Sequence, residues 1–428
     1  MEHSSELLIV GAGAAGLAAA REAARAGVST TILEARDRIG GRIDTRFERG
    51  LGVPIELGAE FVHGTPRITE DLMREAGDRG IPPGERSFRF EDGALREGED
   101  AFEIVGGVMQ RARSLREDVS VAEFTRDLPE RERRFTRMMV AGFDAADPRL
   151  ASTLAIAEEW GDQDNGQTSS EYRPAGGYGP LMEVLRRGLD PAAAQLLLHT
   201  PVHAIEYGSG VTAYARDARG EPVTVRARRA VVTLPLGVLQ AGSVHFEPAL
   251  PPEKIEALRG LIMGPVVKLV LRFRRPFWEG LDGGRLRDGA FFQGAPDPFP
   301  VYWTQAPQPA PLLTAWAGGP NASALEAVEP QRRTELALDG LRALFGSAAD
   351  PRAELESAHA HDWQRDPFAR GAYSYVAVGG ADARAALAAP LAGSLFFAGE
   401  AVSTDGEAGT VAGALETGAA AARAALAR

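Results

Sequence analysis

Near its start the chain carries an apolar run that leads directly into closely spaced glycines. Leu7–Val10 is short and fully apolar, as in a buried strand, and the segment Gly11–Gly16 follows it at once. An alanine-rich stretch with helical spacing then extends to Gly27, and a second apolar run, Ser29–Leu33, ends at Glu34. Strand, glycine turn, helix and strand in this order predict a β-α-β unit. A chain that begins this way is predicted to build an α/β domain of the Rossmann type.

The glycines of this unit occupy the positions that a bound dinucleotide requires. Gly11 permits the tight turn, Gly13 lets backbone N–H groups approach a pyrophosphate, and Gly16 lets the helix pack closely against the strand. Glu34 ends the second strand, where a carboxylate can accept hydrogen bonds from a ribose. A tight helix start in any parallel sheet can mimic the glycines alone, but the acid at the end of the second strand adds to them. We therefore predict that the chain binds a dinucleotide.

Composition narrows the class of protein further. The chain has 428 residues, a length that favours two or three structural units, and its 59 acidic and 47 basic residues give a formal net charge of −12. A surface of this sign repels nucleic acid, and the absence of cysteine excludes disulfides and thiolate metal sites. The histidines lack ligand spacing, so no metal site is predicted. No apolar run has the length of a membrane span or resembles a secretory leader, so we expect no membrane contact and a cytoplasmic location.

Beyond the β-α-β unit, the sequence alternates between helical and strand-like segments. Between residues 65 and 160, helical spacing is interrupted by a hairpin signal around Asp92-Gly93; the helical stretches are Ile68–Ala76, Gly107–Arg116, Val121–Arg126 and Pro129–Phe143, and the hairpin is Ser87–Glu97. Short strands returning to the first domain are predicted at Val202–Ile205, Val211–Tyr214, Val223–Arg226, Ala230–Leu234 and Leu395–Ala398. A second, mostly antiparallel sheet is predicted from Val266–Phe273, Ala290–Gln293, Val301–Thr304 and Leu312–Ala317. Glu326–Leu344 and Gly413–Arg428 predict helices.

A second glycine-rich segment follows Glu34 directly. Gly40 and Gly41 allow close approach of the backbone, and Arg42 can neutralise phosphate through its planar guanidinium. Nicotinamide enzymes do not usually need such a second phosphate clamp. Together with Phe396–Glu400, this segment resembles the flavin-containing amine oxidase family, whose members have a two-dinucleotide-binding domain. The resemblance implies FAD as the cofactor, and it implies non-covalent binding because the chain has no cysteine for a cysteinyl linkage.

The resemblance extends over most of the chain. Its further landmarks are Gly58–Gly64, Pro174–Tyr178, Val232–Leu239 and Trp363–Tyr375, the last being similar to a segment shared by polyamine oxidases and lysine-specific histone demethylases. It implies a discontinuous FAD-binding domain of residues 1–64, 173–262 and 371–428, with an inserted α+β substrate domain of residues 65–172 and 263–370. The cofactor-binding residues that it implies are Gly11, Gly13, Ala15, Gly16, Glu34, Ala35, Arg36, Gly41, Arg42, Gly58, Ala59, Glu60, Val202, Trp363, Gly399, Glu400, Thr410 and Val411. In the family, the acid at the position of Glu400 bonds the ribityl chain of the flavin.

Lys268 is one of only two lysines in a chain that otherwise uses arginine. Its segment, Gly264–Leu271, matches the family segment whose lysine holds a water against flavin N5, which implies a catalytic role. Strand alternation leaves a second interpretation open, because it places Lys268 on the same face as Arg272 and Arg274, where a solvated face would explain all three. The valines that flank Lys268 on that face favour a sheltered position.

The resemblance also implies residues at the substrate. Tyr373 matches one wall of an aromatic enclosure in front of the flavin, although core packing beside Tyr375 would explain it equally well. His63 matches a histidine that several polyamine oxidases place at the substrate nitrogen, and a purely structural role for it stays open. With Thr410 near the isoalloxazine and Glu60 in the loop of His63, the predicted substrate pocket is complete. Lys268, His63 and Tyr373 are the predicted catalytic residues.

The implied function is FAD-dependent oxidation of a small primary or secondary amine, a polyamine or a monoamine. Hydride transfer to flavin N5 would give an imine and then an aldehyde, with O2 reduced to hydrogen peroxide. An L-amino-acid oxidase of the same fold is an alternative, and it would need an arginine for the substrate carboxylate, for which Arg173, Arg365 and Arg370 are available. A flavoprotein desaturase or dehydrogenase and a non-enzymatic flavin-binding module are further alternatives. The sequence predicts no oligomeric state.

Overall fold

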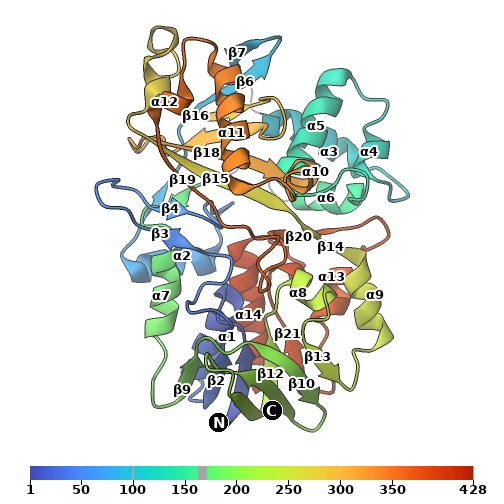
Figure 1. The fold of residues 1–428 in the computed structure, drawn as a ribbon. Coiled ribbons are helices and arrows are strands. Elements are labelled where there is room, and N and C mark those ends of the chain that lie inside the picture. Colours follow the sequence, from blue (N-terminus) through green and yellow to red (C-terminus); the bar gives the residue numbers. More distant parts are fainter. Residues whose placement is uncertain (99–100, 162–170, 428) are drawn as a thin grey trace.

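The computed structural model describes residues 1–98, 101–161 and 171–427. Its elements form two lobes, each built round a β-sheet, with the chain termini together at the far end of the first lobe (Figure 1). The first lobe holds the predicted β-α-β unit, and the second holds the predicted antiparallel strands. The predicted fold class, a Rossmann-like α/β domain with an inserted α+β domain, is confirmed.

The sheet of the first lobe places the carboxyl ends of several parallel strands at one edge. Strand β1 pairs in parallel with β2 and β12, and β12 pairs in parallel with β21, so that Val10 lies opposite Leu33 and Val232, and Val232 lies opposite Phe397. The strand order is β13-β10-β11-β12-β1-β2-β9. The bounds are β1 Glu2–Val10, β2 Thr30–Leu33, β9 Ala194–Leu197, β10 Val202–Tyr207, β11 Val211–Arg216, β12 Pro222–Val232, β13 His245–Glu247 and β21 Leu395–Phe397. Because glycine-rich loops leave this edge after β1 and β21, a site at the edge can draw on both ends of the chain.

Strand β12 corrects one prediction, because the two short strands expected at Val223–Arg226 and Ala230–Leu234 form a single strand. The polar residues Arg228 and Arg229 interrupt its apolar pattern. Its backbone pairing with β1 nevertheless continues through them, with Arg229 opposite Leu7. Main-chain hydrogen bonding therefore extends the strand where side-chain periodicity fails.

Helices α1 (Ala14–Arg25) and α14 (Val411–Leu426) lie side by side against this sheet (Figure 1). A Cβ at Gly16 would lie 1.9 Å from the Gly11 carbonyl oxygen, as expected for a glycine that lets α1 approach β1. Gly418 of α14 has the same role toward α1, since a Cβ there would lie 2.1 Å from the Ala15 carbonyl oxygen. The two helices consequently pack almost backbone to backbone.

Helix α2 (Arg67–Ala76) belongs by its contacts to the first lobe. Its Leu72 and Met73 are buried in the same apolar cluster as α1, α14 and α7 (Gly179–Arg187). The predicted boundaries place α2 in the substrate domain. From these contacts we propose that the insertion begins after α2.

The second lobe is a sheet with strand order β19-β15-β18-β17-β16-β6-β7. Its neighbours pair antiparallel except β6 and β16, which are parallel. The strands are β6 Arg86–Glu91, β7 Ala94–Glu97, β15 Val266–Phe273, β16 Gly289–Gln293, β17 Val301–Thr304, β18 Leu312–Gly318 and β19 Leu355–His359. The predicted hairpin β6-β7 thus extends this sheet rather than interrupting a helical insertion. Helix α11 (Pro330–Phe345) covers one face, where Val267, Leu269 and Leu271 pack against it in one apolar cluster, and the opposite face of β15 presents Lys268.

A helical group lies beside this sheet, as predicted, and consists of α3 Ala101–Ala112, α4 Val121–Phe124, α5 Glu130–Gly142 and α6 Thr153–Gly161 (Figure 1). Helix α3 begins earlier than the predicted Gly107–Arg116. The low helix propensity of Gly106 and Gly107 obscured it in the sequence, but burial of Val105 and Met109 in the core of the group carries the helix through them.

Smaller elements connect the two lobes. Strand β14 (Leu261–Gly264) pairs antiparallel with β20 (Tyr373–Val376), which places Tyr373 opposite Gly264. The remaining elements are β3 Thr45–Arg46, β4 Ile55–Glu56, β5 Gly80–Ile81, β8 Arg173–Pro174, α8 Leu236–Gln240, α9 Pro252–Gly260, η2 Phe277–Gly280, η3 Asp282–Gly284, α10 Gly319–Ala324, α12 Pro351–Glu354, α13 Ala383–Ala388 and η4 Glu400–Val402.

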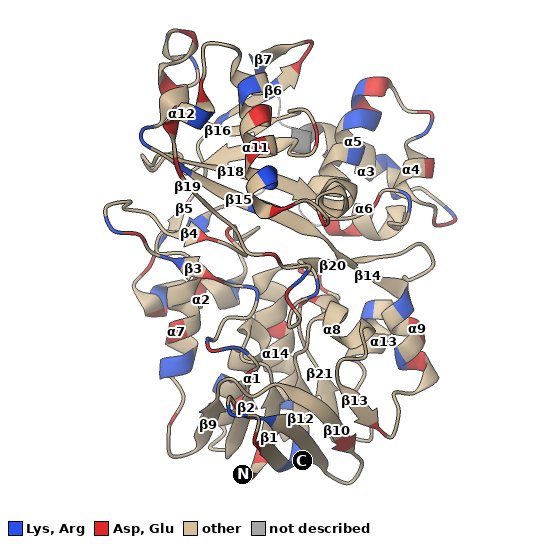
Figure 2. Cartoon of the chain, in the orientation of Figure 1, with Lys and Arg blue, Asp and Glu red and all other residues tan. Residues whose placement is uncertain are grey.

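Charged residues of both signs are interspersed over the two lobes, including along α5 (Figure 2). Two arginines of α5 pair with acids, Arg131 with Glu91 and Arg133 with Glu130, which fits a solvated helix face. A helix with the length and apolarity to cross a membrane does not occur in the described ranges.

Candidate active site

A cavity of about 770 Å³ lies at the carboxyl edge of the first sheet and extends to the Lys268 face of the second. Every residue predicted for the cofactor, the substrate or catalysis lines it, with the exception of Gly16, whose close packing beneath the glycine turn keeps it away from the cavity. The structure therefore brings together residues from both ends and the middle of the chain. We call the part of the cavity beside the glycine turn of the first lobe the cofactor end. The part beside the second sheet is called the substrate end, and both names follow the roles predicted from the sequence.

The glycine turn at the cofactor end fits a pyrophosphate. Gly11 has φ +106°, a conformation that favours glycine, and Gly13 is the N-cap of α1. A Cβ at Gly13 would meet only the backbone of Gly40 and Gly41, at 3.8 Å or more, so a side chain there would fill the space of the cradle. In the part of the chain that the structure describes, no side chain caps the N-terminus of α1. Its N–H groups and dipole can therefore hold a phosphate.

Glu34, predicted to hold a ribose, also holds the loop that surrounds it. It is 3% exposed, and its carboxylate accepts hydrogen bonds from the N–H groups of Ala12 and Arg36, both at 2.8 Å. The guanidinium of Arg36 is engaged with Asp366 at 2.8 Å, while Ala35 and Val202 line the same end of the cavity. Arg36 thus ties the β-α-β unit to the Trp363–Tyr375 segment.

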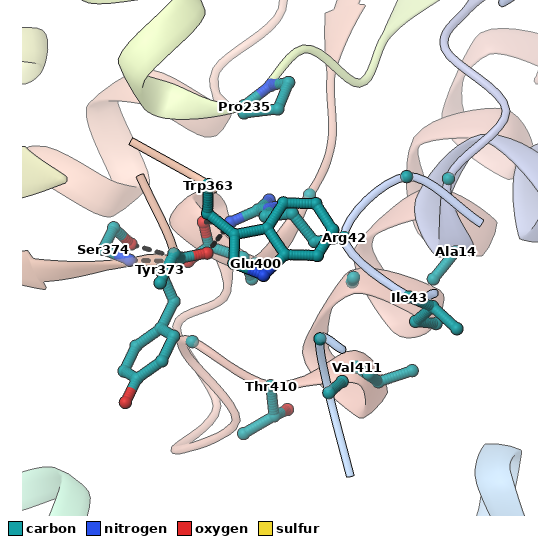
Figure 3. Close-up of a pocket in the computed structure, with 18 of the residues that line it drawn as sticks. Ala14, Arg42, Ile43, Pro235, Trp363, Tyr373, Ser374, Glu400, Thr410 and Val411 are labelled. Atoms are coloured by element: carbon teal, nitrogen blue, oxygen red, sulfur yellow. Dashed lines mark hydrogen bonds and ion pairs between the residues drawn. The ribbon is translucent and has the colours of Figure 1, made fainter. Parts of the chain in front are cut away.

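Arg42, Glu400 and Ser374 form a connected group on the cavity wall (Figure 3). Arg42 Nη1 donates to Glu400 Oε1 at 2.7 Å and to the Ala372 carbonyl at 2.7 Å, and the Ser374 hydroxyl donates to Glu400 Oε2 at 2.7 Å. Burial opposes ionisation of Glu400, but the positive charges of Arg42 and Arg384 keep its pKa below the usual value. Glu400 is therefore an ionised, oriented acceptor beside the cavity, as its predicted cofactor role requires.

Lys268 is buried and paired, so its predicted sheltered position is confirmed. Its side chain is 2% exposed, and Nζ lies 2.8 Å from Glu60 Oε2 and donates to the Gly58 carbonyl at 3.0 Å. Gly58 is held in place by close packing, because a Cβ there would lie 1.8 Å from the Arg42 carbonyl oxygen and 3.2 Å from Trp363 Cζ2. The Trp363 indole donates to the Leu57 carbonyl at 2.9 Å. The Gly58–Glu60 loop, Trp363 and Lys268 thus form one rigid wall.

The substrate end is lined by an aromatic sheet face that the sequence prediction missed. Phe291 lies opposite Trp303 in the pairing of β16 with β17, and Trp316 lies opposite Lys268 in the pairing of β18 with β15. All four side chains line the cavity. The predicted strands carried the signal, since alternation places each of these residues on the face opposite its buried neighbours in the strand.

Tyr373 and Thr410 both line the cavity (Figure 3). The Tyr373 hydroxyl donates to the Phe143 carbonyl at 2.6 Å, which fixes the ring. Burial raises the pKa of this hydroxyl far above its usual value, so it stays neutral. Thr410 caps α14, its hydroxyl accepting a hydrogen bond from the Gly413 N–H at 3.0 Å. Both residues therefore have structural contacts in addition to their places on the wall.

His63 faces the cavity among aromatic rings, with Phe143 edge-on at 5.3 Å between centroids. Its Nδ1 lies 3.5 Å from a carboxylate oxygen of Glu171. Burial lowers the pKa of His63 to about 4, so the imidazole is neutral near pH 7. It can then exchange a hydrogen bond with an amine without repelling it.

Two carboxyl groups at the substrate end also escaped prediction. Asp144 and Glu159 line the cavity, and burial raises the pKa of each, with Glu159 adding to the effect at Asp144. The Trp160 indole lies between 3.2 and 3.3 Å from the two Asp144 oxygens, and Arg384 lies 3.2 Å from Glu159. Both acids come from the helical group, where the sequence offers no motif to single them out.

Clusters of three or more potential metal-ligating side chains do not occur among the residues with described positions. One end of the cavity, at the N-terminus of α1, can bind an anion. The other end is lined by aromatic rings and by the acids Asp144 and Glu159. FAD fits this arrangement: the uncapped α1 terminus and Arg42 suit its pyrophosphate, and Glu34 suits its ribose.

Comparison with known proteins identifies the family. A family model described as flavin containing amine oxidoreductase matches residues 14–86 and 109–426, which is most of the chain. The chain belongs to this family. Membership confirms the resemblance drawn from the sequence, and it makes the protein an oxidoreductase that acts on CH–NH or CH–NH2 groups.

Relatives within the flavin-containing amine oxidoreductases include oxidases of free amines and histone demethylases. The chain is 29% identical to polyamine oxidase 4 of Oryza sativa subsp. japonica over 97% of its own length and 87% of the relative. It is 28% identical to lysine-specific histone demethylase 1B of Mus musculus over 93% of its length but only 50% of the relative.

Solved structures of amine oxidases share the fold over the whole chain. Putrescine oxidase bound to putrescine superposes with a TM-score of 0.81 at 20% identity, covering 100% of both chains. Cyclohexylamine oxidase from Brevibacterium oxydans IH-35A superposes with a TM-score of 0.80 at 25% identity, covering 98% of both chains.

Proposed function

We propose that this amine oxidoreductase binds FAD non-covalently and oxidises a small primary or secondary amine, a polyamine or monoamine, with O2 as the electron acceptor. The observation that supports it most is the single cavity, which joins an uncapped helix N-terminus to a chamber lined by Lys268, His63 and Tyr373. FAD held there would supply a two-electron acceptor for the hydride that leaves the carbon beside the amine nitrogen. The imine so formed would hydrolyse to an aldehyde and release the amine nitrogen, and O2 would receive the two electrons and two protons held by the reduced cofactor to give hydrogen peroxide.

The residues of the substrate end would orient the amine and exclude water. The rings of Trp303, Trp316 and Tyr373 supply apolar surface, and their electron-rich faces favour the amine group. Neutral His63 would accept or donate a hydrogen bond at the substrate nitrogen, and such a dry chamber favours the neutral amine that the reaction requires. Burial raises the pKa of Asp144 and of Glu159, which favours their neutral forms and so suits a neutral amine beside them.

Lys268 would act at the cofactor. Of the three hydrogens on its ammonium, one faces Glu60 and one the Gly58 carbonyl. The third is available for the water that the family resemblance assigns to this lysine.

The contacts of the arginines favour an amine over an amino acid as the substrate. Arg173 is committed to Glu60 at 2.8 Å, and Arg365 is not among the described residues that line the cavity. Arg370 lines it, but its backbone packs against Gly237 of α8, so that a Cβ at Gly237 would lie 2.5 Å from the Arg370 carbonyl oxygen. This contact places Arg370 next to the end of β12, on the cofactor side.

The proposal is tested by anaerobic bleaching of the FAD-loaded protein. Polyamines, monoamines and amino acids are offered in turn, and we expect flavin absorbance to fall with at least one amine and with no amino acid. Admission of O2 should restore the absorbance and release hydrogen peroxide. Bleaching by amino acids alone would establish the amino-acid oxidase, and a protein that stays colourless with excess FAD or is reduced by no amine would refute the proposal.

A further inference from the structure

The carboxylate of Glu60 is the meeting point of donors from several elements. Lys268 Nζ lies 2.8 Å from Oε2, and Arg173 Nε lies 2.8 Å from Oε1. The Trp303 indole donates to both oxygens at 3.1 and 3.2 Å, and the Gln305 amide donates to Oε1 at 3.1 Å. These donors come from β15, β8 and the end of β17, whereas Glu60 lies in the loop after β4.

This cluster is buried and charged. The side chains of Lys268, Glu60 and Arg173 are 2%, 5% and 6% exposed. A buried ion is tolerated only when it is paired and hydrogen-bonded, so each of the three depends on the others. Burial opposes ionisation of Glu60, but Lys268 and Arg173 together outweigh it and hold its pKa at about 2.

We propose that Glu60 is the positioning residue of Lys268, supplying the counter-charge that keeps the Lys268 side chain an ammonium and fixes Nζ at the cavity wall, while Arg173 holds the carboxylate in place. The role of Lys268 toward the cofactor rests on the proposed function, but the dependence of Lys268 on Glu60 does not. Because Glu60 is saturated by protein donors, we also infer that it does not bind the substrate amine, in contrast to its predicted place in the substrate pocket.

The charges around Lys268 determine the direction in which each substitution should change its protonation. Two carboxyl groups interact with Lys268, Glu60 by direct contact and Glu56 from β4 through its charge, while Arg173 contacts the other oxygen of Glu60. Glu60→Gln removes a negative charge and leaves Arg173, so it favours the neutral amine at Lys268. Arg173→Gln removes a positive charge and leaves Glu60, so it favours the ammonium.

The scarcity of lysine makes a direct measurement possible. Labelling lysine with ¹³C at Cε and ¹⁵N at Nζ yields signals from Lys254 and Lys268 alone, and Lys268→Met assigns them. In the FAD-loaded protein we expect Glu60→Gln to weaken proton binding at Lys268 by roughly tenfold or more and to leave Lys254 unchanged. Arg173→Gln should strengthen proton binding at Lys268.

Glu56→Gln is the matched control. Glu56 is a second buried acid near Lys268, but its carboxylate bonds the Thr45 hydroxyl and the Tyr178 N–H. Burial raises its pKa to about 8, so Glu56 is ionised in the alkaline range where a lysine titrates. Because its bonding partners are Thr45 and Tyr178 rather than Lys268, we expect Glu56→Gln to displace the Lys268 titration less than Glu60→Gln does. A Lys268 titration unchanged in folded Glu60→Gln, or displaced equally in Glu56→Gln, would overturn the proposal. If Glu60→Gln does not fold, Arg173→Gln becomes the deciding variant. A Lys268 titration displaced to higher pH supports the proposal, and a titration that is unchanged or displaced to lower pH refutes it.

Activity adds a second readout that separates the two proposals. With an amine that reduces the parent flavin, Glu60→Gln should show a new pH dependence of flavin reduction or reoxidation that follows the Lys268 titration. A purely structural role would lower the rate without adding a titration. If no amine reduces the flavin of the parent protein, the proposed function is refuted. The lysine spectra would still test whether the protonation of Lys268 depends on Glu60.

Discussion

At the scale of single residues, the two lysines show two ways of burying an ammonium. Lys268 faces a carboxylate, whereas Lys254 donates to main-chain carbonyls of Ala386 and Leu387 at the end of α13, at 2.8 and 2.5 Å. Its partners among the residues with described positions are carbonyls rather than carboxylates, and burial lowers the pKa of Lys254 to about 8. Because lysine is scarce, both residues stand out in the sequence. Only their partners, which are distant in the chain, show that Lys268 lines the cavity and that Lys254 caps the end of α13.

Lys268→Met should leave FAD bound and slow amine-driven flavin reduction or reoxidation severalfold, because it removes the ammonium that we propose acts at the cofactor. Stopped-flow absorbance measures both half-reactions. Lys254→Met is the matched exchange outside the cavity, and we expect it to lower the unfolding temperature rather than the rates of the folded enzyme. Rates equal to the parent's in both half-reactions of Lys268→Met would remove this lysine from the mechanism.

Glu34→Ala should weaken FAD binding about tenfold or more, since the ribose and the Ala12 and Arg36 N–H groups lose a buried acceptor. Equilibrium dialysis with flavin fluorescence measures retention. Asp37→Ala, at an exposed acid in the same loop, should bind FAD like the parent. Full occupancy of Glu34→Ala after extensive dialysis contradicts the ribose assignment.

At the scale of elements, side-chain periodicity predicted the strands whose apolar pattern is unbroken. It failed for elements whose pattern is interrupted. Strands β15 and β17 coincide with their predicted bounds, because their apolar residues pack in the core on at least one face. Strand β12 and helix α3 were misjudged where charged residues or glycines broke the pattern while pairing or packing continued. In the site, glycine turns and the Trp363–Tyr375 segment could be predicted, and strand alternation carried a signal for Trp316. Asp144 and Glu159 could not be predicted, because no motif carries them and only tertiary contacts bring them to the cavity.

The contact between α1 and α14 depends on glycine at position 418. Gly418→Ala should destabilise the protein by about 2 kcal/mol or more, because its Cβ would meet the rigid Ala15 backbone. Gly107→Ala in α3 is the same exchange at an exposed helical site with nothing within 4 Å, and it should stabilise by roughly 0.5–1 kcal/mol. Denaturant unfolding measures both, and effects of the same sign would contradict this packing account.

At the scale of the whole molecule, the cavity depends on ties between distant segments. The Arg36–Asp366 ion pair joins the first β-α-β unit to the segment that leaves the second lobe, and β14–β20 pairing carries Tyr373 and Ser374 into the wall. Glu56 makes a comparable link, since it joins β4 to the start of α7 through Tyr178. These ties fix the lobes around one shared site.

Glu56 should make stability depend on pH. Its folded-state pKa of about 8 exceeds the ordinary 4.5, so its contribution is fully present below about pH 4.5 and is lost as pH rises toward 8. Glu56→Gln removes this loss of stability. The unfolding temperature of the variant relative to that of the parent should therefore rise steadily between pH 4.5 and pH 8. Thermal unfolding at several pH values measures the difference, with Glu85→Gln, at an exposed acid, as the control. A difference that stays constant with pH would show that Glu56 is ionised in the folded protein.

The walls of the cavity come from Gly11–Arg42 at one end of the sequence and Gly399–Val411 near the other. During synthesis, a nascent chain that has not yet released β21 and α14 can form the glycine turn but has no Glu400 to face Arg42. We therefore expect the proposed FAD binding to require β21 and α14, so that a chain truncated before Leu395 would stay without flavin even when FAD is in excess.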